Sequence, residues 1–308
     1  MSLVTRLEQG SLSQPTWSAP QKGLLLGLLA TVLFSMTLPA TRWSVQFFDP
    51  IAIGFGRSAI ASIVAAILLR AFNVPWPSAR QIRLLLLTAC GVVLGFPVLS
   101  ALAMKEMGAA QGGVLMGILP LLTAVFGSLL NHERNPLGFW LCSLAGALVV
   151  IAFSCRGGAT SVSFGDFVLM LGILLSAIGY ALGGKLSAEM PGWQVICWAL
   201  VFTAPITWSG YLWFGVAPLQ HSFSGWLAFI YLALVSQLFG FFLWNKGLAL
   251  GGISRVSQIQ LLQPFFTLLL AGVFLGEVID LWTLMCAALV VALVYSGRRF
   301  KLNQEVKS

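Results

Sequence analysis

The chain has 308 residues, of which 58% are hydrophobic and 8% are charged, and its formal net charge is +8. Ordinary soluble domains carry about 25% charged residues, so this composition excludes a soluble protein and predicts an all-α integral membrane protein. A β-barrel is excluded because the apolar runs approach 20 residues in length instead of alternating in short segments.

The apolar runs predict ten transmembrane helices joined by short loops. They cover residues 23–43, 50–70, 82–104, 108–131, 137–155, 165–186, 192–214, 224–246, 252–276 and 280–297. Residues 1–22 form a polar tail without the apolar core of a signal peptide, and residues 298–308 form a basic tail. Thirteen lysines and arginines against three fall on the side that holds both termini, which predicts that both tails are cytoplasmic.

The chain contains an internal duplication. Residues 108–133 and 252–277 repeat uncommon residue types at a constant spacing of 144 positions. The matching residues include Pro120 and Pro264, Thr123 and Thr267, and Glu133 and Glu277, and beyond these ranges Cys142 and Cys286 keep the same spacing. Each predicted repeat, residues 23–155 and 165–297, contains five spans. Because five is odd, the second repeat is expected to enter the membrane inverted, an architecture found in secondary transporters.

Three prolines are expected to break helices near the middle of the membrane. Pro97, Pro120 and Pro264 each lack a backbone N–H, so the carbonyl four residues earlier loses its usual donor. Membrane carriers tend to hold their cargo at such breaks. Glu133 and Glu277 close the two duplicated helices, and we expect them to act in structure or gating, with direct ion coupling as the alternative.

The ninth span, residues 252–276, has two polar stripes on a helical wheel. Gln263 shares one stripe with Thr267, whereas Arg255 and Gln258 lie nearly opposite. One stripe is expected to face a cavity and the other a neighbouring helix, so at least one of the two glutamines is expected to line the cavity. Arg255 either attracts a carboxylate cargo or extends to the cytoplasmic surface, and the second interpretation is favoured.

These features resemble one known family of carriers. The ten spans, the duplication and the motifs GILPLLTAVFGSLLNHE and QLLQPFFTLLLAGVFLGE, together with Pro50 and Arg57 in the second span, are similar to EamA-type permeases of the drug/metabolite transporter superfamily. The resemblance covers residues 23–298, and it departs from the family at His132, where a glycine is usual. It implies a substrate cavity surrounded by helices 1, 3, 4, 6, 8 and 9, with helices 5 and 10 at the edge.

Ten residues are the candidates for substrate binding. They are Thr37, Phe96, Ser100, Gln111, Tyr180, Trp244, Asn245, Arg255, Gln258 and Gln263. A purely structural role remains the alternative for each of them, because glutamines also hydrogen-bond between membrane helices and tryptophans such as Trp244 also anchor helices at the membrane surface.

The lead hypothesis is a secondary transporter that exports a small amphipathic metabolite such as an amino acid. The nine acidic residues lie in tails, in loops or near span ends, which favours transport without proton coupling. A channel or another non-carrier membrane protein is the alternative, and a membrane enzyme is disfavoured because no catalytic motif is present. The amino-acid cargo is an expectation from the family resemblance alone.

The expected partners are a small-molecule substrate and membrane lipid. We expect no catalytic residue, cofactor or metal site, because the five cysteines and two histidines show no ligand spacing. No nucleic acid is expected, because the basic residues are scattered at helix ends. The expected location is the inner membrane of a bacterium.

Overall fold

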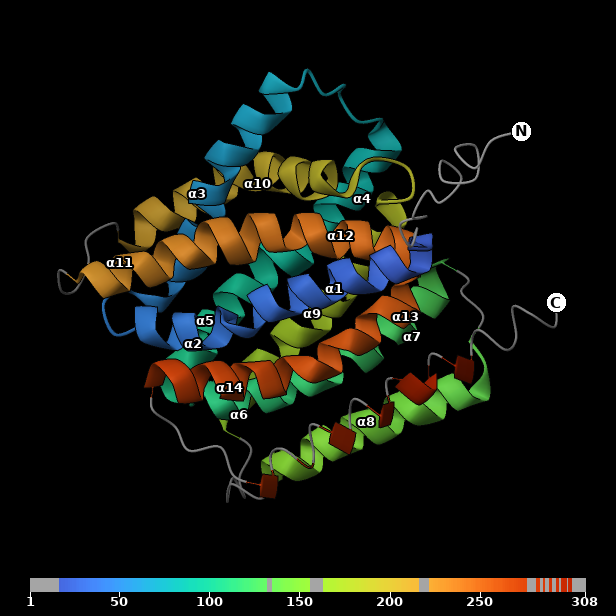
Figure 1. The fold of residues 1–308 in the computed structure, drawn as a ribbon. Coiled ribbons are helices and arrows are strands. Elements are labelled where there is room, and N and C mark those ends of the chain that lie inside the picture. Colours follow the sequence, from blue (N-terminus) through green and yellow to red (C-terminus); the bar gives the residue numbers. More distant parts are fainter. Residues whose placement is uncertain are drawn as a thin grey trace, which may run out of the picture.

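The computed structural model describes most of the chain, and every regular element in the described part is helical (Figure 1). The described residues are 17–131, 135–155, 163–215, 222–275, 281, 282, 285, 288, 289, 292, 293, 295–297, 299 and 300. All predicted spans up to residue 275 fall on helical stretches, several of which are interrupted by a short non-α segment.

The described residues up to 155 form eight α-helices and two non-α helical segments. They are α1 (Ala19–Ser35), α2 (Thr37–Ser44), α3 (Pro50–Ala71), α4 (Ala79–Ala89), the π-helix η2 (Cys90–Gly95), α5 (Phe96–Glu106), α6 (Ala109–Leu115), the 3₁₀-helix η3 (Met116–Ile118), α7 (Leu119–Asn131) and α8 (Leu137–Cys155). In Figure 1, α8 lies at the edge of the bundle.

The described residues from 164 onward repeat the order of helix types from α3 to α7, preceded by one continuous helix in place of α1 and α2. These elements are α9 (Phe164–Leu186), α10 (Gly192–Phe214), α11 (Phe223–Ile230), the π-helix η4 (Tyr231–Phe239), α12 (Gly240–Gly251), α13 (Ile253–Ser257), the 3₁₀-helix η5 (Gln258–Leu262) and α14 (Gln263–Leu275). The described residues between 281 and 300 are also helical.

Six helical stretches of the described residues are long and apolar enough to cross a membrane. They are Ala19–Ser44, Pro50–Ala71, Ala79–Glu106, Phe164–Leu186, Gly192–Phe214 and Phe223–Gly251. Two shorter apolar helices, Met116–Leu130 and Leu137–Val149, accompany them. The protein is therefore a multi-pass membrane protein of the all-helical class.

Local sequence explains where several helices begin. Asp49 accepts hydrogen bonds from the backbone N–H groups of Ile51 and Ala52 at 2.8 and 3.2 Å, and Pro50 takes the first helical position, which needs no donor. Ser78 forms a reciprocal capping box with Gln81 at the start of α4.

Two prolines leave carbonyls that are satisfied by side chains from other helices. Pro39 cannot donate to the carbonyl of Ser35, where α1 ends, and the Thr267 hydroxyl donates to that oxygen at 2.8 Å. Pro97 likewise cannot donate to the carbonyl of Val93, and this oxygen accepts a hydrogen bond from Ser58 Oγ at 2.8 Å. Both kinks therefore depend on contacts between helices.

Pro264 and Pro120 are accommodated within their own helices. Pro264 cannot serve the carbonyl of Gln260, but the 3₁₀ register of η5 brings the N–H of Gln263 to that oxygen. In the same way the N–H of Leu119 serves the carbonyl of Met116 ahead of Pro120. The tighter turn thus replaces the bond that the proline removes.

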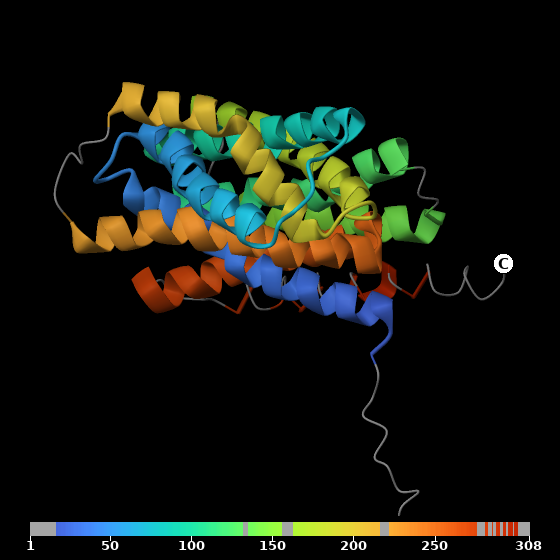
Figure 2. The same ribbon diagram turned by 90° about the horizontal axis from the view of Figure 1, so that it is seen from above.

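Helices α1 and α12 pack with their backbones almost in contact, and they lie side by side in both ribbon views (Figure 1; Figure 2). A Cβ atom added to Gly23 would lie 2.5 Å from the backbone nitrogen of Gly251. Small residues allow such close approach between membrane helices. This contact joins the two halves of the chain.

Candidate functional site

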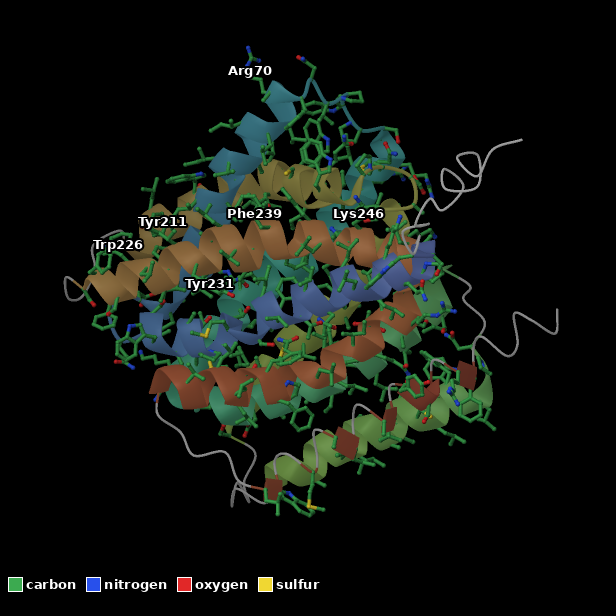
Figure 3. The ribbon with its side chains drawn as sticks, viewed as in Figure 1. Arg70, Tyr211, Trp226, Tyr231, Phe239 and Lys246 are labelled. Carbon is green, nitrogen blue, oxygen red and sulfur yellow. The ribbon has the colours of Figure 1, made fainter. Side chains whose placement is uncertain are left out.

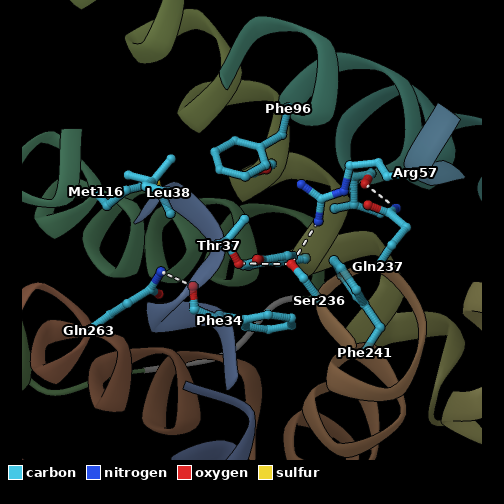
Figure 4. Close-up of a pocket in the computed structure, with 13 residues that line it drawn as sticks. Phe34, Thr37, Leu38, Arg57, Phe96, Met116, Ser236, Gln237, Phe241 and Gln263 are labelled. Carbon is cyan, nitrogen blue, oxygen red and sulfur yellow. Dashed lines mark hydrogen bonds between the residues drawn. The ribbon is translucent and has the colours of Figure 1, made fainter. Parts of the chain in front are cut away.

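A cavity lies between the two halves of the chain. Its free volume is about 20 Å³, which is room for about one water molecule, so a larger solute requires the surrounding side chains to move apart. Its lining residues are Phe34, Thr37, Leu38, Arg57, Val92, Phe96, Met116, Ser176, Tyr180, Ser236, Gln237, Phe241 and Gln263. All of them are buried, the most exposed being Phe96 at 9%. Figure 4 shows these side chains converging from helices of both halves.

Arg57 on α3 brings a cationic group into the cavity. Arg57 is only 2% exposed, and its Nη2 donates a hydrogen bond to Ser236 Oγ at 2.7 Å (Figure 4). The Nε and Nη1 atoms have no hydrogen-bond partner among the described residues. Ser236 Oγ also lies 2.8 Å from Thr37 Oγ1, so a short polar chain runs from α3 through η4 to α2.

The second polar contact ties the two π-helical segments together. Gln237 in η4 donates through Nε2 to the carbonyl of Val92 in η2 at 2.8 Å. A π-helical turn displaces its carbonyls from the regular α ladder, and such turns are frequent at functional sites. The bond therefore stabilises an irregular piece of backbone at the cavity wall.

Aromatic rings form the remaining wall. Phe34 lies 5.2 Å from Phe241 and 6.4 Å from Tyr180 between ring centroids, and Tyr180 lies 5.6 Å from Phe241. Trp244 packs behind them, 5.3 Å from Tyr180. The Phe34–Tyr180 pair is stacked and the other three are tilted or edge-on, and both kinds of arrangement are favourable for aromatic side chains.

The structure places four of the ten predicted substrate-binding residues on the cavity. Thr37, Phe96, Tyr180 and Gln263 all line it. Gln263 Nε2 also donates to the carbonyl of Phe34 at 3.4 Å, so the first polar stripe of the ninth span faces α1.

Three other predicted residues are buried but lie off the cavity wall. Ser100 donates to the carbonyl of Pro97 at 3.2 Å within its own helix. Asn245 donates to the carbonyl of Gly192 at 3.1 Å and thereby links α12 to α10. Trp244 is fully buried, so its interpretation as an anchor at the membrane surface is wrong.

The second polar stripe of the ninth span faces away from the cavity. Gln258 donates through Nε2 to Ser143 Oγ on α8. Arg255 is only 4% exposed, so the favoured interpretation that it extends to the surface is wrong. Neither residue lines the cavity. The two stripes thus contact different neighbours, as the helical wheel predicts.

The predicted helix breaks occupy equivalent local positions. Pro97, Pro120 and Pro264 are each the second residue of a regular α-helix that follows a π or 3₁₀ segment. Glu133 and Glu277 lie outside the described residues, and so does the side chain of Gln111.

Sequence reasoning missed several cavity residues, of which Arg57 is the most informative. It is the only lysine or arginine well inside a predicted span, a signal that is readable from the sequence. Figure 3 shows that Arg70, in the same helix, lies at the periphery of the molecule. Ser236 and Gln237 form a polar pair inside an apolar span and were also missed. The family resemblance did not place the second helix at the cavity, yet Arg57 comes from it.

The described part of the chain brings together no three His, Cys, Asp or Glu side chains that could hold a metal ion. The polar groups of the cavity are hydroxyls, amides and one guanidinium. They can hydrogen-bond and attract charge, which are the properties of a binding site.

Curated proteins similar to this chain are transporters by name. This chain is 43% identical over 289 residues to the "Uncharacterized transporter YdeK" of Bacillus subtilis (strain 168), and the match covers 90% of this chain and 97% of that relative. It is 23% identical to a "Probable terminal-alkyne amino-acid exporter" of Streptantibioticus cattleyicolor, covering 86% and 89% of the two chains. It is 25% identical to a "Probable amino-acid metabolite efflux pump" of Salmonella typhimurium, covering 89% and 94%.

A solved structure matches the fold, and a family profile matches the sequence. A crystal structure with 19% sequence identity superposes with a TM-score of 0.74 and covers 90% of this chain and 98% of its own. The sequence profile described as "EamA-like transporter family" matches residues 21–155 and again residues 163–296. These matches confirm the resemblance carried by the motifs. The chain belongs to the EamA-like transporter family.

Proposed function

We propose that this protein is a secondary transporter that exports a small amphipathic metabolite, such as an amino acid, across the bacterial inner membrane. It works by alternating access, and the substrate binds in the cavity between the two halves. Both termini lie in the cytoplasm, and transport proceeds without proton coupling.

The observation that carries this proposal is that both halves of the chain line the cavity. Residues before 156 and residues after 163 contribute almost equally to its lining, whereas α8, α10 and the described residues between 281 and 300 contribute none. A site formed between two halves changes its access when the halves move against each other. That geometry is what a carrier needs.

Ten transmembrane helices in two inverted five-helix repeats, residues 23–155 and 165–297, are part of the proposal. The double match of the family profile supports it. So does the spacing of the non-α segments: residues 234–239 of η4 lie 144 positions after η2, and residues 260–262 of η5 lie 144 positions after η3. Repeated backbone irregularities are expected from duplicated units.

The break between α1 and α2 offers a place where this movement can occur. Three consecutive carbonyls end α1, and side chains of the second half donate to each of them. Tyr231, which Figure 3 labels, donates to Leu33 at 2.6 Å, Gln263 to Phe34 at 3.4 Å, and Thr267 to Ser35 at 2.8 Å. Helix breaks in membranes are stable where neighbouring helices satisfy the freed groups.

The substrate class and direction rest on relatives and on the cavity chemistry. Two relatives carry names that describe amino-acid or amino-acid metabolite export. The cavity joins a polar group, Arg57 with Ser236, to rings such as Phe34 and Phe241, which suits a solute with one polar and one apolar end.

Transport in proteoliposomes tests the proposal. Vesicles preloaded with a mixed panel of unlabelled amino acids and carboxylates should show saturable, protein-dependent uptake of at least one labelled member by counterflow. Empty liposomes and Pro264→Leu protein serve as controls. Absence of any protein-dependent flux, or a continuous conductance in planar bilayers, would contradict a carrier and favour a channel or another non-carrier role.

A further inference from the structure

We infer that Arg57 binds an anionic carboxylate of the substrate, so that the cavity selects carboxylate-bearing solutes with an apolar body and rejects cations. This inference rests on the proposed transport function and specifies its substrate class. It starts from a buried guanidinium whose hydrogen-bonding capacity is largely unused.

The unused capacity is large for a buried group. A guanidinium has five N–H donors and no acceptor. The donors on Nε and Nη1 of Arg57 have no partner among the described residues, and the residue is only 2% exposed. Burying a charge without full compensation destabilises a fold unless another group compensates it. A ligand that accepts from these donors supplies that compensation.

The described carboxylates do not compensate this charge. Asp49 caps α3, Asp166 belongs to the capping box of α9, Glu189 pairs with Arg80 at 2.9 Å, and Glu106 is exposed at the end of α5. None of the four lines the cavity. Among the residues that the structure describes, the cavity is therefore positively charged.

The groups around Arg57 fit the rest of such a ligand. Ser236 holds Nη2 and so fixes the orientation of the guanidinium. Phe96 and Phe241 line the same cavity and can contact an apolar body. Arginine is the side chain best suited to carboxylates, because its donors are rigidly arranged and weakly hydrated.

This arrangement predicts how the affinity for a ligand depends on the charge of that ligand. A monoanion gains the full attraction of Arg57. A zwitterion gains the same contact, but its ammonium group meets only neutral partners on the described walls, namely hydroxyl and carbonyl oxygens and aromatic rings. A cation gains no such contact and is repelled by the guanidinium. Affinity should fall in the order anion, zwitterion, cation.

Three compounds with the same phenylethyl body test this order. They are 3-phenylpropionate, phenylalanine and phenethylamine, with net charges of −1, 0 and +1. Binding is measured on the purified full-length protein as a thermal shift, and transport as counterflow in proteoliposomes. The variants are Arg57→Gln and Arg57→Lys, with Arg70→Gln, in the same helix but exposed, as the matched control.

Wild-type and Arg70→Gln protein should bind 3-phenylpropionate most tightly. Arg57→Gln should weaken that binding about ten- to a hundredfold, the loss expected for a charged hydrogen bond, and Arg57→Lys should retain part of it. Without ligand, the melting temperature of Arg57→Gln should stay equal or rise, because a poorly compensated charge is removed. A residue with a purely structural role would instead lower it.

The outcomes separate the two proposals. If 3-phenylpropionate binds no better than phenethylamine, or if its binding survives Arg57→Gln, the inference is overturned while transport can stand. If binding depends on Arg57 but no compound on a broad panel is transported, the transport function fails and the binding site stands. If Arg57→Gln does not fold, Arg57→Lys is the deciding variant: a partial loss of 3-phenylpropionate binding supports the inference, and unchanged binding overturns it.

Discussion

The two walls of the cavity differ in how completely their side chains are satisfied. We call Thr37, Arg57, Ser236 and Gln237 the polar wall, and Phe34, Phe96, Tyr180 and Phe241 the aromatic wall. In the aromatic wall, Phe34, Tyr180 and Phe241 form a cluster of rings at centroid distances between 5.2 and 6.4 Å, and Phe96 lines the cavity beside them.

The polar wall, in contrast, joins both halves by hydrogen bonds and still leaves donors of Arg57 unused. The clustered rings of the aromatic wall therefore contact one another without a ligand, whereas the polar wall needs a ligand to accept hydrogen bonds from the unused donors of Arg57. Changes in the polar wall should therefore alter charge selection, and changes in the aromatic wall should alter only the fit of the ligand body.

The largest effect is expected when the polar wall receives its own carboxylate. Ser236→Asp places an acid beside Arg57 Nη2, which lies 2.7 Å from the serine oxygen. The new ion pair should abolish selective binding of 3-phenylpropionate, a loss of about a hundredfold, and raise the melting temperature. Isothermal titration and thermal unfolding measure both.

Ser236→Asn is the control for this charge change, because it has nearly the same size without the charge. It should weaken anion binding far less than Ser236→Asp. Equal losses in the two variants would show that shape, and not charge, controls the polar wall.

A smaller effect is expected when the bond between the π-helical segments is removed. Gln237→Leu leaves the buried carbonyl of Val92 without its side-chain donor at 2.8 Å. An unsatisfied buried group costs about 1–3 kcal/mol, so the melting temperature should fall by several degrees. Gln263→Leu should have a smaller effect on melting, because its bond to Phe34 is longer, at 3.4 Å. The reverse order would contradict a stabilising role for the bond between η2 and η4.

The smallest effect is expected in the aromatic wall. Phe96→Leu removes a ring but keeps an apolar side chain, so the affinity for 3-phenylpropionate should fall only about three- to tenfold. The ranking of anion over zwitterion over cation should persist in competition binding. A change in that ranking would mean that the two walls do not act separately.

Much of the helical framework could be predicted from the sequence. Runs of apolar residues locate the helices, and caps such as Asp49 with Pro50 fix where some begin. The helical wheel of the ninth span separates Gln263 from Gln258, and the structure indeed gives them different neighbours. These features are local, and local patterns are sufficient to predict them.

Features that depend on packing were beyond the sequence. The π-helix η4 contains no proline and is not followed by one, unlike η2 before Pro97, so no local signal marks it. Trp244 lies two residues before the exposed Lys246 in the chain but packs behind Tyr180. The position of Arg57 inside a span could be read from the sequence, but which of several buried polar residues faces the cavity depends on the contacts between helices.

A charge-dependent labelling rate tests the central claim, a positively charged cavity between the halves, most directly. In a cysteine-free background, Ser176→Cys introduces a thiol on α9 at the cavity wall. Modification by negatively charged sulfonatoethyl methanethiosulfonate should be faster than by its positively charged trimethylammonium analogue, and Arg57→Gln should remove the difference. Ser143→Cys, buried off the cavity, should show no such preference. Faster modification of Ser176→Cys by the cationic reagent, or a preference that survives Arg57→Gln, would contradict the account.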